Sequence, residues 1–456
     1  QRAALKSWLD AFDPPALPTA YAPTATAGDG FLLAGSTSGL TLSATAPAVD
    51  GTNPVLDPLP LSGSPADHDK LWLRALEDGS GGARLWLGVL DAGGANANAG
   101  WTYQTSANGR TGWAKPNLGQ VSVGGNTSNN FVNARPSYFT GLDHAPGIGT
   151  GPAWLGCDEI WDAGGTVLGT RLLYSDDGIA WAVGRVIATM TADGVEGGCP
   201  VRRADGRWSV YALQHDPANS RRHVVRYDSY TADCRGGWVG PFAVPAWTAA
   251  SDDRQFYRAV VRRDRGGWLA FVTLYALSTG RMWVEPYASA DEGATWTQLR
   301  DATWLPLGTA GTWSDEVVIS ADTVTLGTGE HLIYFTGGAE NHEVYPRYSQ
   351  VGVAAVPAGR LVYLTGTGTH TTPAGATAGH TARVDADGTG GSVTAAVLTA
   401  GGSVISGYDD TDMTAITGAA SNQLLAWGGL SALPAGADKV RFTLAGSAKL
   451  YGWRVA

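Results

Sequence analysis

Acidic side chains stand near the beginnings of strand-like segments at several places in this sequence. Asp67 and Asp69 directly precede the apolar segment 71–74, and Glu196 precedes Cys199-Pro200. Two carboxylates that face one pocket can carry out acid–base chemistry, one donating a proton and the other acting as nucleophile or base. These residues are therefore candidates for a catalytic pair, provided that the fold brings the strand beginnings together.

Polar and aromatic residues at the beginnings of later strand-like segments suggest contacts to a sugar. An exposed Trp beside Asp and Glu is typical of a sugar subsite, because the apolar face of a sugar stacks on an aromatic ring. The candidate substrate contacts of this kind are Asp253, Gln255, Tyr257, Trp313, Asp315, Glu316 and His342. The sequence has no Cys-x-x-Cys pair and no Gly-rich phosphate loop after a strand, so we expect neither a cofactor nor a metal.

A recurring short phrase indicates how the chain positions these residues. The phrase combines Ser, Asp or Asn, Gly and Trp; its clearest copy is 289–296, and further copies lie at 106–113, 175–181 and 229–238. Ser and Asp side chains bond nearby backbone N–H groups, Gly adopts a positive φ, and the Trp is expected to be buried under the turn. The phrase thus predicts a hairpin turn, and it resembles the Asp-box of sialidase-like propellers.

A second repeat of apolar strands runs in phase with this phrase and divides the middle of the chain into five units. The expected unit beginnings are near Asp67, Phe131, Val186, Asp252 and Trp304. Repeats of roughly 50–65 residues built from short strands are typical of propeller blades. The sequence therefore predicts an all-β fold with a five-bladed β-propeller over 66–357.

The N-terminal and C-terminal parts of the chain differ from the repeats in amino-acid composition. After Pro357 Trp becomes rare, and alternating apolar segments predict a β-sandwich, jelly-roll-like, over 359–456. Residues 16–65 are rich in Pro, Ala, Thr and Gly, and we expect a lead-in segment that wraps the propeller. Residues 1–15 hold an apolar stripe at helical spacing. This helix would pack on its own domain or on a second copy of the chain, which makes a homo-oligomer possible.

The net charge bears on the binding partners of the protein, and the cysteine content bears on its disulfides. The formal net charge of −10 argues against nucleic acid, and no apolar run is long enough to span a bilayer. The cysteines are Cys157, Cys199 and Cys234. Cys157 and Cys199 occupy similar places in neighbouring units, so they either pair or stay as thiols.

The chain resembles the five-bladed propeller glycoside hydrolases of families 32 and 43 that carry a C-terminal sandwich. The matching stretches are 53–56, 113–119, 129–130, 175–181, 253–257 and 312–315, with 404–408 and 448–451 in the sandwich. The resemblance implies three carboxylates at the inner ends of the first strands of units one, two and three. It also implies a carbohydrate as partner.

The resemblance assigns the carboxylates of units one and three as follows. Asp69 would be the nucleophile or base, with Asp67 beside it as a substrate contact. Glu196 would be the general acid, because Glu-Gly-Gly-Cys-Pro resembles the family's Glu-Cys-Pro motif with two glycines intervening. Geometrically, units one and three place their inner strand ends on opposite sides of the axis, so these acids would face each other across a funnel.

Unit two departs from the family pattern. Where the family has an Asp, this chain has Arg135-Pro136. We take Asp143 as the candidate third catalytic carboxylate, with Asp158 and Glu159 as alternatives. Arg135 would contact the substrate and help keep the partner carboxylate of Glu196 ionised.

Two functions remain open at this point. The first is a glycoside hydrolase that acts on a polysaccharide or oligosaccharide. The second is a carbohydrate-binding protein without catalysis, such as a phage tail fibre or spike tip that recognises surface glycans. Both place the protein outside a cell or on a virion surface. An enzyme needs two carboxylates facing one pocket, whereas a binding protein does not.

Overall fold

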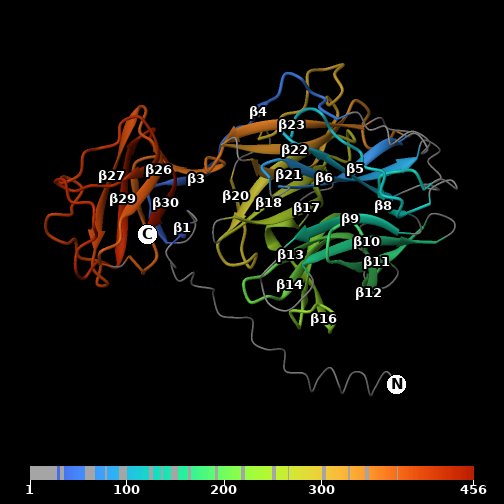
Figure 1. Cartoon of the computed structure of the whole chain (residues 1–456), viewed down its shortest axis with the longest axis horizontal. Coiled ribbons are helices and arrows are strands. Elements are labelled where there is room, and N and C mark those ends of the chain that lie inside the picture. The colour runs from blue at the N-terminus through green and yellow to red at the C-terminus, as the bar shows by residue number, and fades with distance from the viewer. Residues whose placement is uncertain are drawn as a thin grey trace.

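The computed structural model of the chain is all-β, as the sequence predicts, with a β-propeller followed by a β-sandwich (Figure 1). One 3-10 turn, η1 (Pro245–Trp247), accompanies the strands. Within the described ranges, no helix combines the length and apolar character needed to cross a membrane. The structure describes residues 28–30, 35–56, 67–77, 80–91, 100–122, 127–134, 137–144, 153–162, 166–190, 194–216, 221–248, 253–264, 267–299, 304–326, 329–344, 349–376 and 378–455. The helix expected over 1–15 lies outside these ranges.

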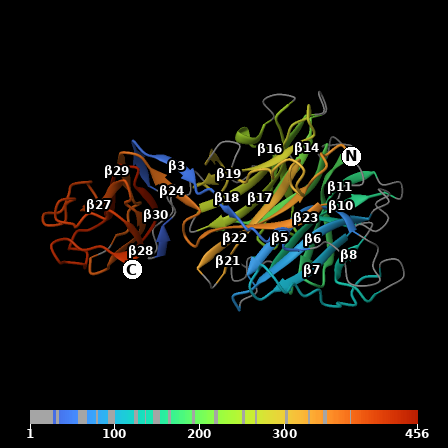
Figure 2. The same ribbon diagram turned by 90° about the horizontal axis from the view of Figure 1, so that it is seen from above.

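Five successive groups of four strands make up the propeller in the described part of the chain (Figure 2), and the fourth and fifth groups are joined into one eight-stranded sheet by the parallel pair Met282–Val317. The first unit holds β5 (Asp67–Glu77), β6 (Ala83–Asp91), β7 (Gly100–Ser106) and β8 (Phe131–Ala134), and the second holds β9 (Ser137–His144), β10 (Trp154–Trp161), β11 (Val167–Ser175) and β12 (Ala182–Thr189). The third holds β13 (Val195–Arg202), β14 (Trp208–His215), β15 (Arg222–Ser229) and β16 (Trp238–Ala243), and the fourth holds β17 (Gln255–Asp264), β18 (Gly267–Tyr275), β19 (Met282–Ser289) and β20 (Thr297–Gln298). The fifth holds β21 (Val317–Leu326), β22 (Glu330–Gly338), β23 (Ser349–Pro357) and β4 (Ala48–Val49).

The first strands of the units form the inner wall of a closed ring. Strand β5 contacts both β9 and β21, β9 also contacts β13, and β17 contacts β13 and β21. Units two and three begin one strand later than expected, because Phe131 opens the outer strand β8 of unit one and Val186 lies in the outer strand β12 of unit two. An outer strand and the next inner strand follow each other closely in sequence, so composition alone does not separate them.

The recurring phrase forms the turn after the third strand of the first four units. In the fourth unit the Ser289 Oγ accepts the Gly293 N–H at 2.8 Å, and the Asp291 carboxylate accepts the Thr295 N–H at 2.8 Å. The expected bonds from Ser and Asp to the turn backbone are therefore present. The Trp that ends each phrase is only partly buried, in contrast to our expectation. The ring instead packs towards the neighbouring unit, as Trp113 does against Tyr334 of unit five and Trp296 against Tyr211 of unit three.

Each phrase also fastens its unit to the preceding one. The Trp86 Nε1–H of unit one donates to the Gly178 carbonyl at 3.0 Å, and Tyr334 of unit five donates to the Gly109 carbonyl of unit one at 2.7 Å. Equivalent bonds join Arg226 to Gly293 at 2.9 Å and Tyr174 to Cys234 at 3.4 Å. The accepting residues all have a positive φ, so the same backbone geometry that closes each turn presents its carbonyl to the neighbouring unit.

Two facing sheets make up the sandwich. One has the order β28 (Ala419–Leu424), β26 (Ala382–Asp387), β30 (Lys449–Val455), β24 (Val362–Thr365) and β3 (Thr41–Ala44), with β1 (Gly28–Gly30) on β30. The other has the order β2 (Ser36–Ser38), β25 (Gly368–Thr371), β29 (Lys439–Gly446) and β27 (Gly391–Leu398). Val384, Phe442 and Trp427 belong to the apolar core between them.

We expected 16–65 to wrap the propeller, and the described residues of this segment are shared between the sandwich and the propeller. Strands β1, β2 and β3 pair with sandwich strands, and Figure 1 shows β1 and β3 beside those strands. Strand β4 pairs with β23 as the outer strand of unit five, and the residues after it continue along the propeller, where the Val55 N–H donates to the Val351 carbonyl at 3.0 Å and Asp50 pairs with Arg110 at 2.9 Å. The chain thus enters through the sandwich and closes the ring with an N-terminal strand. Edge strands of both domains have unpaired backbone groups that this segment satisfies.

Candidate functional site

The propeller has two openings along its axis. The inner strands begin at one opening and end at the other. Residues late in β5, β9, β17 and β21, among them Glu77, His144, Arg262 and Thr325, line one pocket. The ends of the inner strands therefore meet at one opening, which we call the end mouth. Their beginnings meet at the opposite opening, which we call the start mouth and which carries the expected active site.

The candidates of units one and two fall partly outside the described atoms. Asp67 and Asp69 lie at the beginning of β5, where their backbones pair with Asp91 and Leu90 of β6. This places both residues at the start mouth. The side chains of these two residues and the whole of Arg135 lie outside the described part of the chain.

Glu196 stands at the beginning of β13, beside a bulge made by the two glycines that follow it. Glu196 pairs with Leu213 of β14, and the next paired residue of β13 is Cys199. Gly197 has φ +63°, and a Cβ at this position would lie 2.9 Å from the Glu159 Oε1 atom. The departure from Glu-Cys-Pro is thus a β-bulge, a feature that commonly re-aims a side chain near an active site.

The Glu196 carboxylate is partly exposed and has a histidine partner. Its Oε1 atom lies 3.1 Å from the Nε2 atom of His215, the last residue of β14. The two side chains are 21% and 24% exposed. An accessible carboxyl group with an imidazole at this distance can exchange a proton with a bound molecule.

Glu159 of the neighbouring unit lies close to Gly197, the residue that follows Glu196. It is a buried residue of β10, and the contact across Gly197 brings its carboxylate to the beginning of β13. Its neighbour Asp158 is instead bound to Arg171, with an Arg171 Nη2 to Asp158 Oδ2 distance of 2.7 Å. Of the two alternatives in unit two, Glu159 is the one that approaches the start mouth.

Asp143 is not brought to the start mouth. It lies near the end of β9, where its Oδ2 atom accepts the N–H of Arg202 at 3.0 Å. Arg202 is the last residue of β13, whereas Glu196 lies at the beginning of that strand. Asp143 belongs to a buried charged cluster on the axis, so the structure does not place it beside Glu196.

This axial cluster joins all five inner strands. Fully buried Arg74 of β5 lies 3.3 Å from the Asp322 carboxylate of β21 and 3.8 Å from that of Asp143. It also donates to the Cys199 Sγ atom of β13 at 2.9 Å, and Arg262 of β17 donates to Asp322 at 2.9 Å. These negative neighbours raise the pKa of Arg74 against the opposing effect of burial.

None of the three cysteines forms a disulfide bond. Cys157, Cys199 and Cys234 are all buried free thiols. Burial raises the pKa of the Cys157 and Cys234 thiols well above the ordinary value. Among the described residues, no group of three His, Cys, Asp or Glu side chains is placed to hold a metal ion.

Units three to five add a polar and aromatic arc at the start mouth. Gln255 at the beginning of β17 accepts the Arg222 N–H at 3.2 Å, and the Arg222 guanidinium lies over the Tyr257 ring at 5.4 Å. The Tyr257 hydroxyl lies 2.9 Å from the His342 Nε2 atom. Three of the predicted contacts, Gln255, Tyr257 and His342, are thus brought together.

Glu343 extends this arc. It accepts hydrogen bonds from the Tyr275 hydroxyl and from His342, and these bonds lower the pKa of its carboxyl group. Sequence reasoning missed His215, Arg222, Tyr275 and Glu343. His215 and Tyr275 end second strands, Arg222 begins the third strand β15, and Glu343 lies in a loop. No sequence repeat marks these positions.

The remaining predicted contacts support loops beside the start mouth. Asp253 accepts the Ser278 N–H at 2.9 Å, which lowers the pKa of the Asp253 carboxyl group. Trp313 stacks on Phe335 with the ring centroids 5.7 Å apart and remains partly exposed. The last two are Asp315, which accepts the Gly311 N–H, and Glu316, which binds Arg281 through two bonds of 2.9 Å.

Comparison with models of known protein families gives no match, and neither does comparison with curated proteins. Among solved structures, the chain is similar to one from the GH130 family, reported for glycoside hydrolases that target β-1,2 mannosidic linkages in Candida mannan. The identity is 13% over 69% of this chain and 94% of that chain, with a TM-score of 0.47. A family 43 arabinoxylan arabinofuranohydrolase from Bacillus subtilis is 12% identical over 91% and 99% of the two chains, with a TM-score of 0.40. The catalytic domain of a GH62 α-L-arabinofuranosidase from Coprinopsis cinerea is 11% identical over 70% and 97%, with a TM-score of 0.43.

Proposed function

We propose that the protein is a glycoside hydrolase that acts on a polysaccharide or oligosaccharide at the start mouth. The observation that carries this proposal is the position of Glu196. Its partly exposed carboxylate lies at the beginning of an inner strand and is bound by His215. Asp69 and Asp67 begin another inner strand of the same ring, so the beginnings of the two strands that carry these acids lie at one opening.

In this proposal Glu196 donates the proton to the glycosidic oxygen. Asp69, or Asp67 as second choice, acts as nucleophile or as base for a water molecule. A carboxyl separation of about 5 Å would give retention of configuration, and about 6.5–9.5 Å would give inversion. His215 would orient the Glu196 carboxyl group and exchange its proton between turnovers.

Glu159 takes the place of the third carboxylate in unit two. It is buried beside Gly197, so it would act on the bulge that follows Glu196 without contacting the substrate. Asp143 has no role in this proposal.

The arc of Tyr257, His342 and Gln255 would bind the sugar. A partly exposed tyrosine ring beside hydrogen-bonding side chains suits both the apolar face and the hydroxyl groups of a sugar. The same arc supports the second candidate function, a glycan-binding protein without catalysis. It lies in units four and five and needs no acid from unit one. Either activity would act on glycans outside a cell or from a virion surface.

A glycan array followed by product analysis on the bound glycans tests the proposal. We expect the wild-type protein to shorten a glycan that it binds, and Glu196→Gln to bind that glycan without cleaving it. Tyr257→Ala should weaken binding of the same glycan. Binding without product in the wild type would favour the second function, and full turnover in Glu196→Gln would remove Glu196 from the mechanism.

A further inference from the structure

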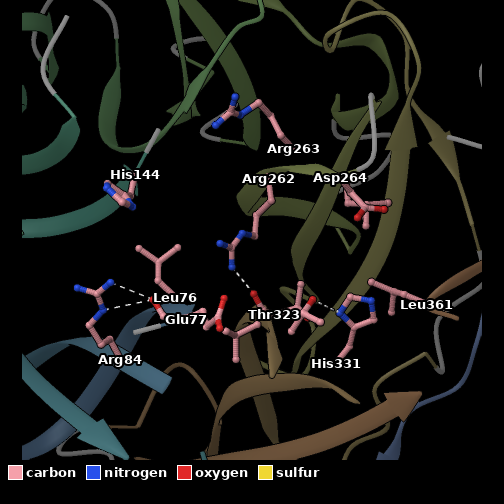
Figure 3. A pocket seen from close by; sticks show the side chains of 13 residues that line it. Leu76, Glu77, Arg84, His144, Arg262, Arg263, Asp264, Thr323, His331 and Leu361 are labelled. Carbon is pink, nitrogen blue, oxygen red and sulfur yellow. Dashed lines mark hydrogen bonds between the residues drawn. The ribbon is translucent and has the colours of Figure 1, made fainter. Parts of the chain in front are cut away.

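The end mouth holds a pocket that the proposed hydrolase site does not use. It has a volume of about 440 Å³ and is lined by residues from the ends of several inner strands, with Leu361 of the sandwich on one side. Figure 3 shows Arg263, His144 and Arg84 on different sides of the pocket, with Arg262 in the centre. The buried cluster around Arg74 lies on the axis between this pocket and the start mouth. The two mouths are therefore separate sites.

Two arginines of this pocket have no acidic partner. Arg262 is paired with Asp322, but no carboxylate among the described residues lies within ion-pair distance of Arg84 or Arg263. Arg84 is held in place by two bonds from its guanidinium to the Glu77 carbonyl, at 3.0 and 3.3 Å, and it lies 5.8 Å from the Trp154 ring. Arg263 is exposed. One fixed and one adjustable guanidinium therefore face the opening.

His144 lies near both unpaired arginines of this mouth. It stacks on Trp154 with the ring centroids 4.0 Å apart, and it is partly buried. Burial, together with the charges of Arg84 and Arg263, lowers the pKa of His144, although Asp143 acts in the opposite direction. Because Asp322 pairs with Arg262, and Glu77 and Asp264 line the same pocket, cationic and anionic groups are presented there together.

The pocket also offers hydrogen-bond acceptors and exceeds the size of an ion. Glu77 and Asp264 line it together with Thr323 and Thr325. Carboxylates accept bonds from hydroxyl groups, while guanidinium groups bind oxyanions with two parallel bonds. A volume of this size suits an organic molecule of about one sugar ring.

We propose that the end-mouth pocket binds a small hydroxylated oxyanion, such as a sugar acid or a sugar phosphate. Arg84 and Arg263 bind its carboxylate or phosphate group, and Glu77 and Asp264 accept bonds from its hydroxyl groups. The site acts independently of the glycan-cleaving site, since no residue is shared between the two mouths.

Isothermal titration calorimetry of the full chain tests this site with glucuronate, glucose 6-phosphate, neutral glucose and inorganic phosphate as separate ligands. We expect glucuronate or glucose 6-phosphate to bind and glucose not to bind. Binding of glucose with equal affinity would overturn the proposal, because it would show that the anionic group is not recognised. Binding of inorganic phosphate alone would overturn the assignment to an organic ligand.

Two variants locate the binding within the molecule. Arg263→Ala should weaken binding at least about tenfold, since a charge-assisted pair of bonds is lost, and Arg263→Glu should abolish it. Both changes are at an exposed side chain, so an unchanged circular dichroism spectrum is expected. Arg383→Ala, on the sandwich, is the matched control and should bind as the wild type does. Wild-type affinity in Arg263→Glu would refute the site, whereas Glu196→Gln should leave this binding unchanged whatever its effect on glycan cleavage.

Discussion

The hydroxyl group of Tyr334 fastens the last unit of the ring to the first. Tyr334 is fully buried, and its hydroxyl donates to the Gly109 carbonyl at 2.7 Å. Burial raises the pKa of Tyr334, so the hydroxyl stays protonated and able to donate throughout the pH range in which the protein is stable. We predict that Tyr334→Phe destabilises the propeller while leaving its shape unchanged.

The size of the effect follows from the bond that is lost. Removing a buried neutral hydrogen bond costs about 0.5–1.5 kcal/mol, and a carbonyl left without a partner adds a desolvation cost that brings the total to about 1–3 kcal/mol. The ring itself is retained in phenylalanine, so no large cavity forms. The Gly109 carbonyl lies under Tyr334 and has little room for water, which favours the upper part of this range.

Urea unfolding followed by tryptophan fluorescence measures this change. Trp113 lies 5.9 Å from Tyr334 and reports on the same interface. Tyr363→Phe in the sandwich is the matched control, because the Tyr363 hydroxyl makes no hydrogen bond among the described residues. A decrease in the free energy of unfolding of less than about 0.5 kcal/mol for Tyr334→Phe would refute the idea that this bond helps to close the ring.

Three further substitutions test the axis, the sandwich and the start mouth. Asp322→Asn leaves two arginines without their shared partner and should reduce the stability of the propeller by about 3–5 kcal/mol, as measured by chemical unfolding. His370 is buried, and burial lowers its pKa from 6.5 to about 4. The unfolded chain therefore takes up this proton first, so the sandwich should lose up to about 3 kcal/mol as the pH falls from 6.5 to about 4; an equally steep loss in His370→Asn would contradict this. Gly197→Ala should abolish glycan cleavage, since its Cβ would meet the Glu159 carboxylate at 2.9 Å. Gly112→Ala, which has the same φ of +63° and no neighbour within 4 Å, should retain cleavage, and equal loss in both variants would point to backbone strain instead.

Local features of the sequence determined the repeat and its turns. The Ser, Asp and Gly of each phrase bond to backbone within a few residues, as in the Ser289 and Asp291 bonds, so their spacing is enough to predict them. Strand periodicity likewise determined an all-β propeller and a following sandwich. Glu196 could be recognised as a candidate because it precedes an inner strand, and the direction of that strand sets which mouth it reaches.

Tertiary structure decided which side chains meet. Asp143 resembles a site acid in the sequence, but it lies near the end of its strand and joins Arg74 on the axis. His215 reaches Glu196 because β14 runs antiparallel to β13, which brings the last residue of one strand beside the first residues of the other. Such contacts depend on strand register across turns whose length the local sequence does not specify.

Long-range pairing also decided where the N-terminal segment belongs and which tryptophans are buried. Strands β1 to β3 complete the sandwich and β4 completes the propeller, because both domains have open edges that only a distant segment can pair. Trp86 lies between two units and is fully buried, whereas Trp296 at its turn remains partly exposed. The sequence determined the strands and turns, and the closure of the ring determined which of their side chains face a neighbour, the axis or solvent.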